Sequence, residues 1–368
     1  MTQQRLVLLF DGTWNDPEDQ TNVYRTARRL HDFDGGVRQR FFYSPGVGTS
    51  KWERFRGGTF GYGLSRNLLQ GYEWLAKRYT DGDEIWIFGF SRGAYTARSL
   101  VGLIRKCGLL HIVTPALLDE AEQIYRDKRL HPDSDTCKEF KACYSLEPRI
   151  HFIGVWDTVG ALGIPGTVLS EKGRYSWHDT ELSGIVDHAY HAVALDEHRA
   201  AYDVALWTTK DGHKKPRNIE VEQRWFIGAH ANVGGGYGSE DSLADLPLQW
   251  LLNRAARAGL KLDDFKAADD AWRTTPRDSF TAFLKGVYAW FRRMRAGGDG
   301  RSYRRYSEGI NGRPAVNVSV DESVWKRWQE AEFNYRPRTL TSARDAGNGP
   351  WRTEPIPRYK KRSRGNTA

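Results

Sequence analysis

Apolar and polar positions follow two different periods along the first two-thirds of the chain. Short, almost continuous apolar runs predict buried strands at residues 5–10, 40–43, 85–90, 150–156 and 223–227. Between them, apolar residues recur every three or four positions and predict helices at residues 21–30, 64–79 and 94–104. Strands that alternate with helices are typical of an α/β protein. We therefore expect a mostly parallel central sheet with helices on both faces.

Two further segments change this picture. Glycine-rich residues 57–63 predict a flexible loop. After Lys261 the alternation fades, and apolar residues at helical spacing predict one amphipathic helix over residues 280–295. We expect residues 1–345 to form one domain, in which residues 262–310 are a mainly helical cap or insertion. Basic residues 346–368 are expected to form a flexible tail.

The apolar run at residues 85–90 stops at Gly89, Phe90, Ser91, Arg92 and Gly93. A serine between two glycines, after a strand and before a helix, is the pattern of a nucleophile elbow. The flanking glycines let strand and helix approach each other at the tight turn. The pattern predicts that Ser91 is a nucleophile. The alternative is a Gly-Ser turn whose hydroxyl only caps the helix.

A nucleophilic serine needs a base and a carboxylate that orients the base. Asp157 directly follows the fourth predicted strand, and His230 follows the fifth and opens a glycine-rich loop. Because the chain order Ser, Asp, His is that of α/β-hydrolases, we expect Ser91, Asp157 and His230 to form the catalytic set. Asp241 and Asp245 are the alternative candidates for the carboxylate that orients the base.

Acyl transfer also needs hydrogen-bond donors for the negatively charged oxygen that develops on the substrate. The backbone N–H of Arg92 is expected to be one donor. The turn after the first strand is expected to supply the second through Gly12 or Thr13. The same turn begins with Asp11, so it can alternatively bind a phosphate or a metal ion.

A metal-dependent hydrolase is a second interpretation of these residues. His188, His191 and His198 lie close together in the sequence and could supply ligands together with Asp11 and Asp157. The three cysteines have no CxxC spacing, so they indicate neither a zinc site nor a disulfide framework. His230 is preferred to this cluster as the base, because it follows a predicted strand and precedes a glycine-rich loop, whereas the three clustered histidines do not. We therefore expect no metal and no cofactor.

The 368-residue chain has a formal net charge of +9, concentrated at residues 285–305 and after residue 352. A basic surface attracts anions, either phospholipid head groups or nucleic acid. Since no nucleic-acid-binding motif accompanies the charge, we expect no nucleic acid and retain peripheral contact with an anionic membrane. The oligomeric state is not indicated.

The sequence contains no apolar run of the ~20 residues that a transmembrane helix needs. The apolar stretch near the amino end is too short for a signal peptide. These two observations predict synthesis in the cytoplasm without Sec-type export.

Five motifs resemble, in this order, those of a known family: Phe10 to Thr13, Gly89 to Ala94, Gly154 to Gly160, Ala194 to Arg199 and Gly228 to Tyr237. They are similar to the catalytic domain of the type VI secretion lipase effectors of the first class, and a late match at residues 323–337 extends the similarity. The resemblance implies an α/β-hydrolase core and phospholipase or esterase activity through an acyl-enzyme. It places the Ser-Asp-His triad on Ser91, Asp157 and His230, and it leaves export by a non-Sec route open.

One position departs from the pattern of this family. Its members usually carry an acid two residues after the histidine, where this chain has Asn232. If that acid tunes the histidine, catalysis in this chain is weaker or differently regulated.

Residues and resemblance together predict a serine hydrolase of carboxylic esters, with phospholipids as the expected substrates. Two alternatives stay open. One is a non-catalytic or nucleic-acid-binding protein on a hydrolase scaffold, and the other is the metal-dependent hydrolase.

Overall fold

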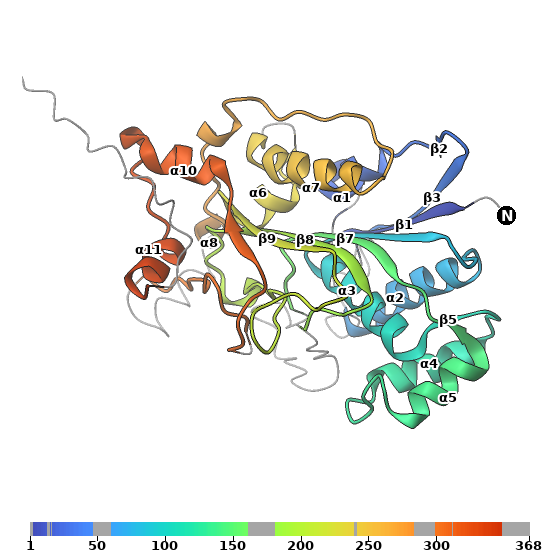
Figure 1. Ribbon diagram of the computed structural model, residues 1–368. Helices are drawn as coiled ribbons and strands as arrows, with labels where there is room; N and C mark the ends of the chain where they lie inside the picture. Colours follow the sequence, from blue (N-terminus) through green and yellow to red (C-terminus); the bar gives the residue numbers. More distant parts are fainter. Residues whose placement is uncertain are drawn as a thin grey trace, which may run out of the picture.

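A mostly parallel sheet organises the part of the chain that the computed structural model describes, namely residues 3–12, 15, 17–46, 60–160, 181–238, 241–282, 299–310 and 312–347 (Figure 1). Eight strands of this part follow the order β10-β9-β8-β7-β4-β1-β3-β2. All neighbours pair in parallel except β2 and β3, which form an antiparallel hairpin. The strands are β1 (Gln4–Phe10), β2 (Phe33–Asp34), β3 (Val37–Ser44), β4 (Glu84–Phe90), β7 (Ile150–Trp156), β8 (Val186–Ala194), β9 (Glu220–Phe226) and β10 (Val318–Val320). A separate antiparallel pair consists of β5 (Leu109–Leu110) and β6 (Ser145–Leu146).

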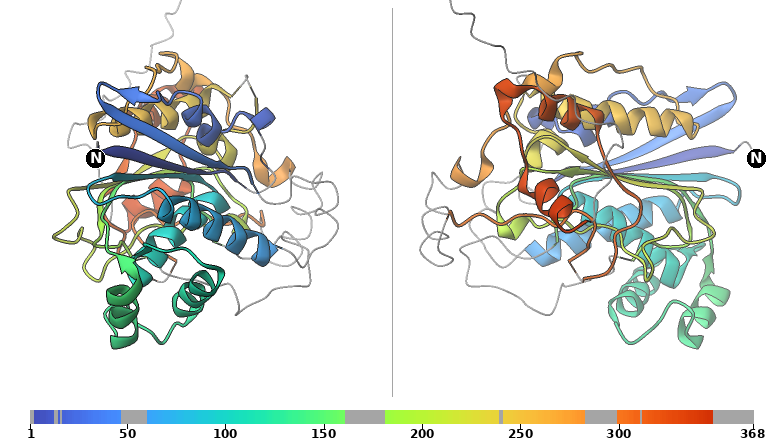
Figure 2. Two further views of the ribbon diagram at one scale, coloured as in Figure 1. Left: turned by 90° about the vertical axis from the view of Figure 1, so that its right-hand side faces the viewer. Right: turned by 60° about the vertical axis from the view of Figure 1, so that its left-hand side comes forward.

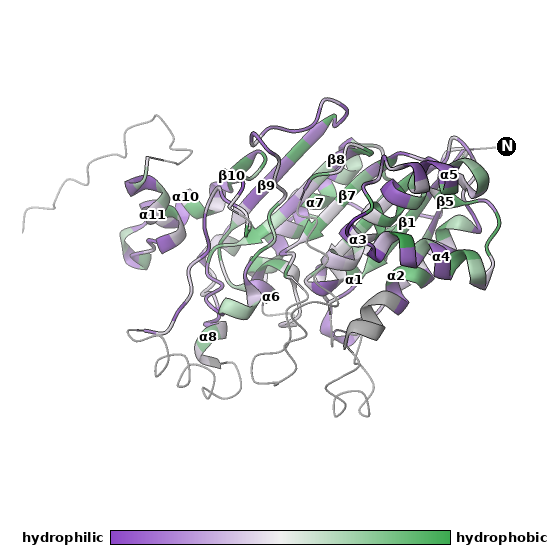
Figure 3. Cartoon of the chain, turned by 90° about the horizontal axis from the view of Figure 1, so that it is seen from below, coloured by the Kyte–Doolittle hydropathy of each residue, from purple (hydrophilic) through white to green (hydrophobic). Residues whose placement is uncertain are grey.

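Helices cover both faces of this sheet (Figure 2). One face carries α1 (Asn22–Ala27), α6 (His230–Gly234) and α7 (Asp245–Arg257). The other face carries α2 (Phe60–Ala76) and α3 (Arg92–Cys107), with α4 (Pro115–Arg126) and α5 (Asp135–Tyr144) packed on α3. Further helices are α8 (Ser279–Ala282), α10 (Glu322–Gln329) and α11 (Arg338–Asp345), and short 3-10 turns lie at Pro17–Asp19, Ala200–Tyr202, Ser242–Ala244, Ala271–Arg273 and Ala331–Phe333. Hydrophilic and hydrophobic residues alternate along α4 and α11, as burial of one helix face requires (Figure 3).

Strand β1 shows why the molecule has two helical layers. Successive side chains of a strand point to opposite faces of its sheet. Leu6, Leu8 and Phe10 belong to the apolar core on the side of α2 and α3, whereas Val7 and Leu9 belong to the core on the side of α1 and α7. All five side chains are buried. A continuous apolar run therefore forms a strand that is covered on both faces.

The sheet brings together residues that are far apart in the sequence. In parallel strands, all carboxyl ends lie at the same edge. Ser91 follows β4, Asp157 follows β7 and His230 begins α6 after β9. The order of strands changes direction between β1 and β4, because the chain continues from β1 to β3 on one side and to β4 on the other. Ligands of open α/β sheets bind at such a switch point.

The predicted strands and the mostly parallel sheet are confirmed. The five predicted strands correspond to β1, β3, β4, β7 and β9. Strands β8 and β10 were not predicted. The sequence of β8 interrupts its apolar residues with Asp187, His188 and His191, and β10 has three residues. Pairing with neighbouring strands, rather than an apolar pattern, makes these segments extended.

Several predicted elements have other bounds in the structure. The helix predicted at residues 64–79 spans Phe60–Ala76, and the helix predicted at residues 94–104 spans Arg92–Cys107. The helix predicted at residues 21–30 spans Asn22–Ala27, because Thr21 is its N-cap and accepts a hydrogen bond from Tyr24 N–H at 3.2 Å. The loop predicted at residues 57–63 is helical from Phe60 onward, and its first three residues lie outside the described residues.

Most of the predicted amphipathic helix over residues 280–295 also lies outside the described residues, which include α8 but not residues 283–298. The same holds for residues 348–368 of the predicted tail. Among the described residues, no helix combines the length and the apolar character needed to cross a bilayer. The proposed division into a domain of residues 1–345 and a tail stays a prediction.

Glycine allows α3 to begin directly against the backbone of two strands. A Cβ atom on Gly93 would lie 2.2 Å from the carbonyl oxygen of Phe10 and 2.4 Å from that of Asp11. A Cβ atom on Gly89 would lie 2.7 Å from Ala94 Cα. Both distances are shorter than van der Waals contact and involve main-chain atoms. The two glycines around Ser91 are therefore required by packing.

The substitution Gly93→Ala should lower the free energy of unfolding by about 2 kcal/mol or more, since the strand end and the helix must move apart. Gly36→Ala is the matched control, because a Cβ atom there meets nothing within 4 Å and should change stability by less than about 0.5 kcal/mol. Denaturant titration of both variants measures the difference. Equal stability of the two variants would contradict this account of the turn.

Candidate active site

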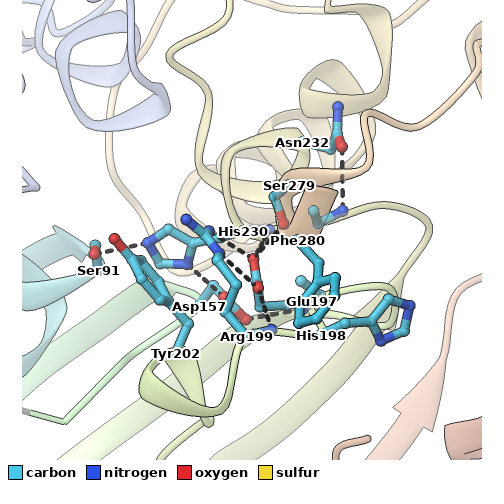
Figure 4. Close-up of polar contacts among 12 residues, drawn as sticks. Ser91, Asp157, Glu197, His198, Arg199, Tyr202, His230, Asn232, Ser279 and Phe280 are labelled. Atoms are coloured by element: carbon cyan, nitrogen blue, oxygen red, sulfur yellow. Dashed lines mark hydrogen bonds and ion pairs between the residues drawn. The ribbon is translucent and has the colours of Figure 1, made fainter. Parts of the chain in front are cut away.

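Ser91 occupies a strained turn between β4 and α3 (Figure 4). Its backbone has φ 58° and ψ −122°, a conformation that costs a non-glycine residue on the order of 1–3 kcal/mol. Its N–H donates to the carbonyl oxygen of Trp156 at 3.0 Å, which holds the turn beside the end of β7. The turn directs the Ser91 hydroxyl toward His230.

His230 connects the serine to a carboxylate. Its Nε2 lies 2.7 Å from Ser91 Oγ, and its Nδ1 lies 2.6 Å from Asp157 Oδ2 (Figure 4). An ionised carboxylate only accepts hydrogen bonds, so the imidazole proton belongs on Nδ1 and leaves Nε2 free to accept from the serine. The three residues predicted from the sequence thus form one continuous hydrogen-bonded chain.

Asp157 is completely buried at the end of β7. Its carboxylate accepts from Ala194 N–H at 2.9 Å and from both terminal nitrogens of Arg304, at 2.6 Å to Oδ1 and 2.9 Å to Oδ2. Burial alone would raise the pKa of Asp157, but the charge of Arg304 and the hydrogen bond from His230 outweigh burial. They hold the pKa of this carboxyl well below its usual range, so Asp157 stays ionised.

Arg304 was missed by the sequence analysis as a part of the site. It belongs to the basic segment 285–305, which was interpreted as a surface for anions, but it is only 5% exposed. Besides Asp157, it donates to the carbonyl oxygens of Ala194 at 2.8 Å and Tyr202 at 2.5 Å. A single arginine among many offers no pattern by which its burial could be predicted. For this residue, the surface interpretation is wrong.

Burial lowers the pKa of His230 below the ordinary value of 6.5, and the hydrogen bond and charge of Asp157 oppose this effect only in part. The imidazole is therefore neutral at pH 7. A neutral imidazole that accepts a hydrogen bond from a serine hydroxyl can remove the hydroxyl proton. The arrangement can generate a nucleophile near neutral pH.

The histidines of the metal-dependent alternative do not converge. His191 is buried in β8, where its Nε2 accepts from Thr158 N–H at 3.0 Å and its Nδ1 lies 3.2 Å from Gln223 Oε1. Burial lowers its pKa to about 3. His198 packs instead against the ring of Tyr303. Among the described residues, no group of three or more His, Cys, Asp or Glu side chains could hold a metal ion.

The alternative candidates for the orienting carboxylate have other partners. Asp245 forms an ion pair with Arg25 at 2.5 Å, and Asp241 accepts from Asn232 Nδ2 at 2.9 Å. The carboxylate that contacts the imidazole of His230 is Asp157.

The carboxylate of Asp11 accepts hydrogen bonds from several groups around the turn after β1. Asp11 accepts from Gly12 N–H at 2.7 Å, from Thr21 Oγ at 2.6 Å and from the Tyr43 hydroxyl at 2.8 Å. Burial raises the pKa of Asp11 to about 6, although these hydrogen bonds oppose the rise. The Gly12 N–H therefore already donates to a carboxylate, and its role as an oxyanion donor stays a prediction. Thr13 lies outside the described residues.

Asn232 is hydrogen-bonded within the loop that carries His230. Its Oδ1 accepts from Ala229 N–H at 3.1 Å, and its Nδ2 donates to Asp241. Burial raises the pKa of Asp241, and the hydrogen bond from Asn232 opposes this rise. The residue at this position therefore acts on the loop that carries His230.

Comparison with known sequences identifies relatives. Residues 4–254 match the family profile described as T6SS, phospholipase effector Tle1-like, catalytic domain. Over 231 residues the chain is 31% identical to an uncharacterized protein of Saccharomyces cerevisiae, a match that covers 56% of this chain and 33% of that protein. The match thus spans about one third of the length of this relative.

Two solved structures are similar at low identity. One is the Tle1 effector bound to the VgrG spike from the type 6 secretion system, with 14% identity and a TM-score of 0.46 over 82% of this chain and 81% of that chain. The other is an uncharacterized protein from Pseudomonas aeruginosa, with 19% identity and a TM-score of 0.41 over 74% and 48% of the two chains.

Replacing Asn232 by aspartate should destabilise this chain. In Asn232→Asp, two carboxylates would face each other where Asn232 Nδ2 now donates to Asp241 at 2.9 Å. We expect a loss of about 1–3 kcal/mol at pH 7.5 and a smaller loss at pH 5, because a proton taken up by the pair relieves the repulsion. Thermal unfolding at both pH values measures this.

The exchanged pair Asn232→Asp with Asp241→Asn restores one carboxylate and one amide. We expect it to recover most of the lost stability. If the double variant is no more stable than Asn232→Asp alone, the contact does not determine what this position tolerates.

Proposed function

Because the chain belongs to the Tle1-like family of type VI secretion phospholipase effectors through its catalytic domain, we propose that it is a serine hydrolase that cleaves carboxylic esters of phospholipids. The family is one of phospholipases and therefore of hydrolases. The observation that carries the serine mechanism is the chain of contacts from Ser91 to His230 at 2.7 Å and from His230 to Asp157 at 2.6 Å.

In the first half of the proposed reaction, Ser91 Oγ attacks the acyl carbon while His230 Nε2 accepts its proton. The imidazolium that forms keeps its Nδ1–H bonded to Asp157, whose low pKa leaves the proton on the ring. His230 then returns the proton to the departing alcohol oxygen. An ester between the acyl group and Ser91 remains.

In the second half, a water molecule replaces the alcohol. His230 Nε2 accepts a proton from this water as the oxygen attacks the acyl carbon, and it returns the proton to Ser91 Oγ when the ester breaks. The products are a carboxylic acid and the free serine.

The negative oxygen of each tetrahedral intermediate needs hydrogen-bond donors. We assign one to the backbone N–H of Arg92, the first residue of α3, which follows the nucleophile directly. The N–H groups of Gly12 and Thr13 stay the candidates for the second donor, although that of Gly12 already donates to Asp11.

We also propose an α/β-hydrolase fold, export by a non-Sec route and contact with membranes. A parallel sheet, a strained serine between strand and helix, and the chain order Ser91, Asp157, His230 support an α/β-hydrolase fold within one domain of residues 1–345. Export by a non-Sec route follows from the family, and peripheral contact with anionic membranes follows from the net charge of +9.

Incubation with vesicles of phosphatidylethanolamine and phosphatidylglycerol, followed by mass spectrometry of the lipids, tests the function. Wild type should release fatty acid and lysophospholipid, and Ser91→Ala should lose at least about a thousandfold in rate. Activity in a chelator should stay complete. Equal hydrolysis by Ser91→Ala, or loss of activity in the chelator, would contradict the serine mechanism.

The pH dependence follows from the state of His230. The reaction needs the neutral imidazole, whose pKa is lowered by burial. On a soluble ester, the half-maximal point of kcat/KM should therefore lie below pH 6.5, and kcat/KM should fall about tenfold per pH unit below the lowered pKa. A half-maximal point above pH 7 would mean that the imidazole is not held in this state.

A further inference from the structure

A buried ion pair lies beside His230 and takes no part in the proton transfers proposed for Ser91, His230 and Asp157 (Figure 4). It is formed by Glu197 and Arg199, which follow β8. Glu197 Oε1 accepts from both Nε and the backbone N–H of Arg199 at 2.8 Å, and Oε2 accepts from Nη2 at 2.7 Å. The Glu197 side chain is completely buried and that of Arg199 is 9% exposed. A buried ion pair is expensive to desolvate, so its presence calls for a function.

Glu197 holds the main chain of His230. Its Oε2 accepts from His230 N–H at 3.3 Å and from the Ser279 hydroxyl at 3.0 Å. One carboxylate thus connects the segment after β8 with the first residue of α6 and the first residue of α8. The position of the base depends on a group that contacts neither Ser91 nor Asp157 in the reaction.

Arg199 acts on the ring of His230 through an aromatic side chain. Its guanidinium carbon lies 3.6 Å from the centre of the Tyr202 ring. The Tyr202 ring meets the imidazole edge to face, with centroids 5.1 Å apart. The Phe90 ring lies 4.7 Å from the imidazole centroid. Two aromatic rings therefore confine the imidazole, and Arg199 holds one of them in place.

We propose that the Glu197–Arg199 ion pair positions the catalytic base, His230. Glu197 fixes the main chain of His230, and Arg199 fixes its ring through Tyr202. The inference rests on the proposed function, because it assigns the pair to the reaction of Ser91.

The two charges also affect the pKa of His230, which a purely structural contact would not do. The titratable and charged groups around His230 come from several elements: Ser91, Asp157, Glu197, Arg199, Tyr202 and Arg304. Glu197 raises the pKa of His230 and Arg199 lowers it. While both charges are present, their effects on the pKa of the imidazole oppose each other. Removal of either charge alone should shift the titration of His230, in opposite directions.

The rate constant of labelling by a fluorophosphonate probe, measured between pH 4.5 and 8.5, reports this titration in the free enzyme without a known substrate. In Glu197→Gln the acid limb should move down by about one pH unit, and in Arg199→Gln it should move up by about the same amount. In the double variant the limb should return to the wild-type position. At pH 8 each single variant should label about ten to a hundred times more slowly, because the imidazole is displaced.

Two further variants separate position from charge. Tyr202→Leu removes the ring contact without removing a charge, so labelling should slow at pH 8 while the acid limb stays in place. Glu222→Gln is the matched control for loss of a glutamate that pairs with arginines, since Glu222 of β9 binds Arg224 of the same strand and Arg254 of α7, each at 2.7 Å. Its labelling rate and acid limb should equal those of wild type. Circular dichroism and thermal unfolding identify which variants fold.

If the folded single variants keep the acid limb of wild type, or if both shift it in the same direction, the proposal is overturned. If Arg199→Gln or Glu197→Gln does not fold, Tyr202→Leu and the double variant decide. A wild-type labelling rate at pH 8 in Tyr202→Leu would contradict the role of the ring contact. A shifted acid limb of the pH profile in the double variant would contradict the view that the two charges offset each other. Failure of the proposed function looks different, because wild type and Ser91→Ala would then label equally.

Discussion

The bidentate contact between Arg304 and Asp157 is the interaction on which the site depends. A carboxylate without exposed surface would be protonated if nothing compensated its burial, and a protonated carboxyl cannot orient the imidazole as an ionised acceptor can. Arg304 compensates the burial and comes from a segment 147 residues further along the chain. It also donates to main-chain oxygens at Ala194 and Tyr202, so the same side chain joins the segments around the base. Removal of one partner from such a buried pair typically costs about 3–5 kcal/mol, so the site and the fold of the carboxyl-terminal segment depend on each other.

The geometry of the sheet supplies the remaining constraint. Parallel strands bring Ser91, Asp157 and His230 to one edge, but the side chains meet only because two of these residues adopt a backbone conformation that is unfavourable for them. Ser91 has φ 58° and Asp157 has φ 40°. Each lies at the end of a strand and is tied to a neighbouring strand by a main-chain hydrogen bond, to Trp156 and Ala192 respectively. The close approach of α3 at Gly93 holds the first turn, and the pair of Glu197 and Arg199 borders the histidine. Backbone strain at Ser91 and Asp157 is thus stabilised by packing around them.

Local patterns predicted the parts of this protein that depend on local sequence. The apolar runs revealed five strands, and the serine between glycines revealed the turn at Ser91, because both signals lie within a few residues. Long-range contacts were not predictable in the same way. Nothing near Arg304 distinguishes it from the surrounding surface arginines, and β8 is extended through its neighbours despite polar residues. The bond from the Gly12 amide to Asp11 was not predictable for a similar reason, since Thr21 and Tyr43, which fix that carboxylate, lie elsewhere in the chain. Histidines clustered in sequence suggested a metal site, whereas the strand directs His191 to Thr158 and Gln223.

The central claim is that Ser91 is made nucleophilic by His230, and the site of covalent modification tests it most directly. Purified wild type and His230→Ala are treated with a fluorophosphonate at pH 8, digested, and mapped by mass spectrometry. The account predicts one adduct, on Ser91, that forms at least about a thousandfold more slowly in His230→Ala. An adduct on another residue, or the same rate of modification without the imidazole, would contradict it.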